Sequence, residues 1–143
     1  MKSETNELHE LAVLARRSIE PGLLRDGAGR PVSAGTCLHA CLVVAMLLRR
    51  FGRGVPAVRG GSAGYGALDT SGEWRGHYWV EAQMKSGSIF VVDVTADQFG
   101  HEAVVVLPLS QSSERYRNGP QCEVDEAFEE LANEFNCRDL FAA

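Results

Sequence analysis

Three residues in separate parts of the sequence have the side chains of a cysteine-based nucleophilic site: Cys37, His77 and Asp93. Cys37 stands where an apolar helix is expected to begin. A thiol in the first turn of a helix ionises more readily, because unpaired backbone N–H groups and the helix dipole favour the thiolate. A thiolate nucleophile needs an imidazole for proton transfer, and the imidazole needs a carboxylate or amide to orient it. His77 and Asp93 supply these two groups.

Each of the three residues also has an ordinary structural interpretation. Cysteine is among the most buried residue types, so a single cysteine at a helix start is more often a packing residue than a nucleophile. A histidine that begins a strand often packs or caps, and an aspartate after an apolar strand commonly marks its end. The combination of Cys37, His77 and Asp93 in this order is what favours catalysis.

A predicted hairpin can bring two of these residues together. Residues 77–83 and 88–94 alternate or run apolar and aromatic around the turn Lys-Ser-Gly-Ser, which is typical of two antiparallel strands. Such pairing can place His77, at the start of one strand, beside Asp93, near the end of the other. A helix packed on this sheet could bring Cys37 to the same point.

Helical periodicity predicts three helices, which with the hairpin give a single α+β domain over residues 1–143. Residues 36–50 are almost all apolar or small, so this helix is expected to be central and buried, with Ser33 or Thr36 as its cap. Two amphipathic helices are expected to flank it, at residues 3–20 behind Ser3 and at residues 123–135.

The remaining segments are assigned to short strands and one long loop. A short strand is expected near 57–59 and an edge strand at 103–109, where Pro108 limits pairing. The glycine-rich segment 59–76 between strands is expected to be a mobile surface loop.

Three aromatic residues are candidates for contact with a substrate. If the loop before His77 acts as a lid, Tyr65 or Trp74 would touch the substrate. Trp79 and Glu81 share the alternation phase of His77, so one of them is expected to pack beside the site and the other to be solvated or to support the site from further out.

Composition excludes several classes of partner. The 143 residues carry a formal net charge of −5, and such a field repels phosphate backbones and anionic lipid, so neither nucleic acid nor a membrane is expected as partner. The longest apolar run is too short to cross a bilayer. The sequence starts without the apolar region of a secretory signal, which predicts a cytoplasmic protein or export without a classical signal peptide.

The four cysteines are predicted to be free thiols and not metal ligands. Cys37, His39 and Cys41 form a run that resembles a zinc motif, but on a helix His39 points away from the face that the two cysteines share. No metal and no cofactor are therefore expected. Asp97 and His101 follow soon after Asp93, and either could replace it beside the imidazole if the hairpin register differs; these alternatives stay open.

Three stretches carry a resemblance to a known family: GTCLHACLVVAMLLRRFGRGVPAVRGG, GHYWVEA and FVVDVTADQFG. Together they are similar to the core of the transglutaminase-like cysteine enzymes, a branch of the papain-like superfamily. The resemblance covers residues 33–100 and implies a papain-like core over about 33–109. It implies that Cys37 is the nucleophile, His77 the general base and acid, and Asp93 the residue that orients His77.

The resemblance also implies the reaction. Family members attack a carboxamide or peptide carbonyl to give a thioester, which water resolves in proteases and deamidases and an amine resolves in cross-linking enzymes. Leu38 stands where many relatives have an aromatic residue, and no glutamine precedes Cys37 at the spacing of papain, so the second oxyanion donor is open.

The sequence thus predicts a thiol hydrolase or acyltransferase that acts on a protein or peptide substrate. Protease or deamidase activity is favoured over cross-linking, because no second site for an amine is evident. Two alternatives stay open: a non-catalytic protein-interaction module on the same fold, and acyl transfer like that of the arylamine N-acetyltransferases, which share a similar Cys, His, Asp order but have longer chains.

Overall fold

The computed structural model describes residues 3–134 except 30, 34, 52 and 63, and shows an α+β fold. Its main sheet has four antiparallel strands in the order β3-β6-β7-β8. These strands are β3 (Gly54–Gly61), β6 (His77–Met84), β7 (Ile89–Asp93) and β8 (Val105–Pro108). The three α-helices are α1 (Glu4–Ile19), α2 (Cys37–Arg50) and α3 (Gln121–Glu134).

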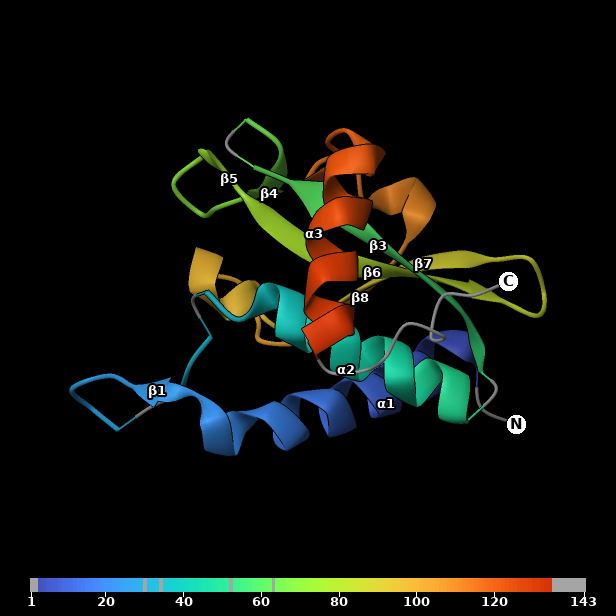
Figure 1. The fold of residues 1–143 in the computed structure, drawn as a ribbon, viewed down its shortest axis with the longest axis horizontal. Helices are drawn as coiled ribbons and strands as arrows, with labels where there is room; N and C mark the ends of the chain where they lie inside the picture. Colours follow the sequence, from blue (N-terminus) through green and yellow to red (C-terminus); the bar gives the residue numbers. More distant parts are fainter. Residues whose placement is uncertain (1–2, 30, 34, 52, 63, 135–143) are drawn as a thin grey trace.

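The three helices share one hydrophobic core with one face of the main sheet (Figure 1). α2 packs on β3 and β6, α1 packs on α2 and β8, and α3 packs on β3. The central helix on an antiparallel sheet is therefore as predicted. The core contains, among others, Leu8, Ala12, Val44, Leu48, Val80, Val92, Val124 and Phe128.

A second, smaller core lies on the opposite face of the sheet, around Trp79 and Tyr116. A three-stranded sheet contributes to it, in the order β5-β4-β9. Its strands are β4 (Gly66–Leu68), β5 (Trp74–Arg75) and β9 (Tyr116–Arg117), and the short helix η2 (Ala96–Phe99) also packs here. His77 and Asp93 belong to this face, at the end of the sheet where α2 begins.

The remaining elements connect these layers. The pair β1 (Leu24–Arg25) and β2 (Pro31–Val32) forms an antiparallel hairpin between α1 and α2 (Figure 1). The single turns η1 (Glu20–Gly22) and η3 (Leu109–Gln111) follow α1 and β8.

The helix ends agree with the sequence in most respects. The Ser3 hydroxyl accepts a hydrogen bond from the Asn6 N–H at 3.2 Å, so the predicted cap of α1 is confirmed. Thr36, one of the two predicted caps, is the N-cap residue of α2. Its hydroxyl, however, donates to the Ser33 carbonyl and makes no cap bond to the helix.

The glycine-rich segment differs from the expected loop. β3 extends from Gly54 to Gly61, well beyond the expected 57–59, and the segment 59–76 also contains β4 and β5. Gly66 has a φ of 102°, and a Cβ there would lie 2.1 Å from the Arg75 carbonyl oxygen. Glycine here permits close strand pairing, which is why a composition rich in glycine was a misleading sign of a loop.

The last two predicted elements are largely confirmed. The predicted edge strand is present as β8, with Pro108 at its end opposite Phe90. α3 begins at Gln121, two residues before its predicted start, while Phe135, its predicted end, lies outside the described residues.

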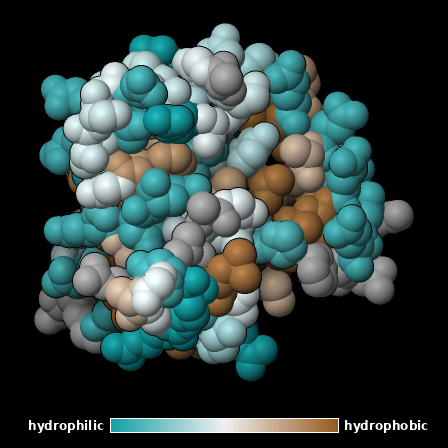
Figure 2. Space-filling model, turned by 90° about the vertical axis from the view of Figure 1, so that its left-hand side faces the viewer, coloured by the Kyte–Doolittle hydropathy of each residue, from teal (hydrophilic) through white to brown (hydrophobic). Residues whose placement is uncertain are grey.

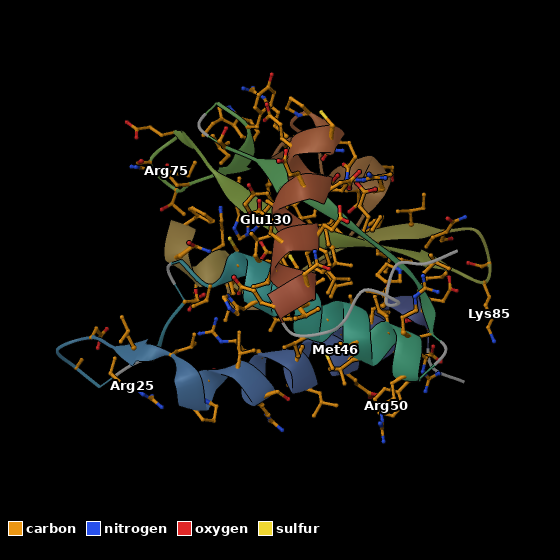
Figure 3. All side chains as sticks on the ribbon, in the orientation of Figure 1. Arg25, Met46, Arg50, Arg75, Lys85 and Glu130 are labelled. Carbon is orange, nitrogen blue, oxygen red and sulfur yellow. The ribbon has the colours of Figure 1, made fainter. Side chains whose placement is uncertain are left out.

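Several charged side chains from different elements lie on the surface: Arg25, Arg50, Arg75, Lys85 and Glu130 (Figure 3). On the face shown in Figure 2, apolar residues lie in separate patches between hydrophilic ones. In the part of the chain that the structure describes, no helix is long and apolar enough to cross a membrane.

Candidate active site

His77 and Asp93 form a buried pair at one end of the main sheet. The Nε2 atom of His77 lies 2.8 Å from the Oδ2 atom of Asp93, and the two residues are 0% and 2% exposed. The β6–β7 register pairs Val80 with Val92, which places His77 and Asp93 diagonally on the same face. The structure thus brings these two residues together as the hairpin argument expected.

Three further hydrogen bonds orient the Asp93 carboxylate. The Thr95 N–H donates to Oδ1 at 3.0 Å, and the Thr95 hydroxyl contacts the same oxygen at 3.4 Å. The Tyr116 hydroxyl donates to Oδ2 at 2.9 Å. The contact from the Thr95 N–H is that of an Asx-turn, in which an Asp side chain accepts from the backbone two residues on. Neither Thr95 nor Tyr116 was identified from the sequence.

The electrostatics of this pair favour two opposite charges. Burial disfavours the charged ring of His77, but Asp93 and then Cys37 outweigh this effect and raise the pKa of His77 from 6.5 to about 9. Burial alone would raise the pKa of Asp93, but His77, Thr95 and Tyr116 together lower it below its ordinary value. At neutral pH the pair is therefore an imidazolium and a carboxylate.

Cys37 lies beside the same imidazole. It is the first residue of α2, is partly exposed, and contributes to the raised pKa of His77 both by a hydrogen bond and by charge. Since Nε2 of the ring is bound to Asp93, the atom available to the thiol is Nδ1. Cys37, Asp93 and Thr95 also line one narrow pocket. The three residues singled out from the sequence meet at one place.

The start of α2 gives Cys37 a suitable backbone setting. The first backbone hydrogen bond of the helix runs from the Ala40 N–H to the Thr36 carbonyl, at 2.9 Å. Helix geometry provides the Cys37 N–H with no acceptor inside the helix. A donor at this position can point toward an oxyanion that forms next to the sulfur.

The short helix η2 closes over the imidazole. Gln98 places its Nε2 atom 3.4 Å from Nδ1 of His77, and the Phe99 ring meets the His77 ring edge-on, with 4.7 Å between centroids. These two residues were not identified from the sequence. The only signal for them is their position, five and six residues after Asp93 in the turn that follows its strand.

The three aromatic candidates occupy different environments. Trp79 is 1% exposed and packs between His77 and Tyr116, with centroid distances of 6.1 and 4.8 Å. It therefore supports the imidazole from inside the molecule. Tyr65 is exposed and lies over Gly61, which is paired with His77. Trp74 lies under the guanidinium of Arg117, which is 4.0 Å from the centre of its ring.

The two alternative partners for the imidazole make other contacts. Asp97 accepts hydrogen bonds from Arg16 and Ser33. His101 contacts the Leu68 carbonyl through Nε2, at 2.7 Å. The observed register thus makes Asp93 the carboxylate that contacts His77.

Among the residues that the structure describes, there is neither a candidate metal site nor a disulfide bond. No group of three or more His, Cys, Asp or Glu side chains within them is placed to bind a metal ion. Cys37, Cys41 and Cys122 are free thiols, and burial raises the pKa of Cys41 well above its ordinary value. Cys137 lies outside the described residues.

Comparison with protein-family models, with curated proteins and with solved structures found no significant match.

Proposed function

We propose that this protein is a cysteine hydrolase or acyltransferase with a transglutaminase-like, papain-like core, which acts on a protein or peptide amide through a thioester. The observation that carries the proposal is the buried His77–Asp93 pair, 2.8 Å apart, whose free ring nitrogen faces a thiol at a helix start. Such a sulfur, imidazole and carboxylate are the parts that activated cysteine nucleophiles require.

In the first half-reaction, Cys37 attacks the substrate. In the resting site the thiol proton already lies on Nδ1 of His77, and Asp93 stabilises this imidazolium, so the sulfur attacks as a thiolate. The sulfur then bonds to the carbonyl carbon, and the oxyanion lies near the Cys37 N–H. When the C–N bond breaks, Nδ1–H gives its proton to the leaving nitrogen, which departs as an amine or as ammonia. A thioester and a neutral imidazole remain.

In the second half-reaction, water resolves the thioester. The neutral Nδ1 of His77 accepts a proton from water as the water oxygen bonds to the carbonyl carbon. The C–S bond then breaks, the proton passes from Nδ1 to the sulfur, and the acid product leaves. Hydrolysis, as by a protease or deamidase, is preferred to cross-linking, because the sequence offers no evident second site for an amine. Free thiols persist in a reducing compartment, so we propose the cytoplasm, or export by a route without a classical signal peptide, as its location.

Differential alkylation of the cysteines tests whether Cys37 is activated. Cys122 is exposed, whereas Cys37 is only partly exposed, so accessibility alone predicts that Cys122 reacts first. Activation by His77 reverses this order. With limiting iodoacetamide at about pH 6, we expect peptide mass spectrometry to find Cys37 alkylated at least ~10-fold faster than Cys122.

Turnover is tested with a pool of glutamine-containing peptides. We expect the wild type to release ammonia or new amino termini and the Cys37→Ala variant to release neither, while a Cys122→Ser variant keeps the activity. If Cys122 is alkylated first and Cys37→Ala behaves as the wild type, the enzyme proposal is wrong and a non-catalytic interaction module replaces it. Acyl transfer requires instead that acetyl-coenzyme A binds, which calorimetry measures.

A further inference from the structure

The Nδ1 atom of His77 has two polar neighbours, the Cys37 thiol and the side-chain amide of Gln98. The orientation of the amide follows from its other contact. Nε2 of Gln98 lies 3.0 Å from the Thr95 carbonyl oxygen, which can only accept, so the atom facing it must be the NH₂ nitrogen. One N–H of Gln98 thus donates to Thr95, and the other points toward Nδ1 at 3.4 Å.

The two neighbours suit opposite protonation states of the ring. Because Asp93 accepts from Nε2–H, a neutral His77 has a lone pair at Nδ1 and a charged His77 has a proton there. The Gln98 N–H can donate only to the lone pair, so this contact belongs to the neutral ring. The Cys37 thiolate can only accept from Nδ1–H, so the ion pair belongs to the charged ring.

We propose that Gln98 is a positioning residue that stabilises the neutral, Nε2-protonated form of His77 and so keeps Nδ1 ready to accept a proton from water after Cys37 is acylated. This role deepens the proposed function and rests on it. An acylated sulfur carries no charge, so it no longer favours the imidazolium. Gln98 then becomes the polar neighbour that determines the state of Nδ1.

Several other groups face the imidazole and must be held constant in a test. Asp93 on β7 and Cys37 on α2 both favour its charged form. Tyr116 on β9 acts one step further away, through Asp93. η2 also carries Asp97, whose carboxylate is paired with Arg16. Replacing Cys37 with alanine removes the thiol and leaves Gln98 as the neighbour to be tested at Nδ1.

The experiment is an NMR titration of the ¹⁵N-labelled His77 ring in the Cys37→Ala protein. We compare that protein with Cys37→Ala/Gln98→Ala and Cys37→Ala/Gln98→Glu. Loss of the amide donor should raise the pKa of His77 by about 0.5–1 pH unit, since one hydrogen bond to the neutral form is lost. The carboxylate of Gln98→Glu should raise it further, because it favours Nδ1–H. The control Cys37→Ala/Gln83→Ala, which removes an exposed amide from β6, should leave the pKa of His77 as it is in Cys37→Ala.

The proposal is supported if the pKa of His77 is lowest with Gln98, higher in the Gln98→Ala protein and highest in the Gln98→Glu protein. Equal values in the three proteins, or a lower value in Gln98→Ala, overturn it. Gln98 is partly exposed, and the amide spectrum of each variant shows directly whether the fold is retained. Because Cys37 is absent from every sample, the result is independent of its reactivity, so this proposal and the proposed function can fail separately.

Discussion

Arg16 and Asp97 form a bidentate ion pair that connects α1 to η2, the turn behind the candidate site. Two guanidinium nitrogens of Arg16 donate to the Asp97 carboxylate at 2.9 and 2.8 Å, and one of them also donates to the Val94 carbonyl at 3.0 Å. Ser33, just before α2, donates to the same carboxylate. A single carboxylate thus joins α1, the segment that leads to Cys37 and the turn that carries Gln98.

Removal of this guanidinium should weaken the whole fold. The side chain of Arg16 is 6% exposed, so Arg16→Met leaves Asp97 and the Val94 carbonyl without their buried partner. We expect a loss of about 3 kcal/mol in the free energy of unfolding, measured by urea denaturation. Arg17→Met changes an exposed neighbour on the same helix and should cost less than about 0.5 kcal/mol. Equal effects of the two substitutions would contradict a role for the Arg16–Asp97 pair.

The Tyr116 hydroxyl should contribute measurably to stability, because it donates to a buried, charged carboxylate. Tyr116→Phe removes the 2.9 Å hydrogen bond to Asp93 and leaves the ring in place. Hydrogen bonds to charged groups contribute about 1.5–3 kcal/mol, so we expect a loss of about 2 kcal/mol in urea denaturation. Tyr65→Phe, which changes an exposed tyrosine, is the matched control and should be nearly neutral. If Tyr116→Phe left the free energy of unfolding unchanged, the Asp93 carboxylate would have to be solvated in another way.

Local pattern was enough to predict part of this site. The alternation of β6 and β7 around a tight turn predicted that His77 and Asp93 lie side by side, because a short hairpin fixes its own register. The helix start at Cys37 was likewise visible from the change to an apolar run. These predictions depend on residues that are close in sequence or that belong to the same strand or helix pattern.

The remaining parts of the site depend on long-range contacts without a local signal. Tyr116 reaches Asp93 because β9 pairs with β4, where Gly66 is opposite Arg117. Two-residue strands such as β9 are too short for a period to appear. The glycine-rich segment was misread for a related reason: its glycines allow backbones to approach closely, and that requirement depends on partners elsewhere in the chain.

Gly60 is a position where glycine is required beside the candidate site. Its φ is 143°, and a Cβ there would lie 2.1 Å from the His77 carbonyl oxygen and 2.8 Å from the Tyr78 Cα atom. Gly60→Ala should therefore displace the start of β6 and cost about 3 kcal/mol or more. Gly22→Ala, where no atom lies within 4 Å of the added Cβ, should be neutral or slightly stabilising. Thermal and urea unfolding measure both; a tolerated Gly60→Ala would mean that β3 and β6 are not paired as described.

The His77–Asp93 pair should make stability depend on pH in a defined direction. Because the pKa of His77 is raised from 6.5 to about 9, its contribution is full below about pH 6.5 and declines as the pH rises through about 9. Because the pKa of Asp93 is lowered from 3.8, its contribution is present above about pH 3.8 and is lost as the pH falls further. The pair is therefore most stabilising between these limits.

A double variant without charges, His77→Gln/Asp93→Asn, provides the reference for this pH dependence. We expect the stability difference between wild type and double variant to fall from pH ~5.5 to pH ~10, by at most about 1.4 kcal/mol for each unit between 6.5 and 9. Urea denaturation of both proteins at about pH 5.5, 7.5 and 10 measures the difference, and titrating groups that do not contact the pair contribute equally to both. A difference that stays constant, or grows toward alkaline pH, would show that His77 is not held as an imidazolium by Asp93. The proton-transfer steps proposed for Cys37 and Gln98 would then have to start from a neutral His77 ring.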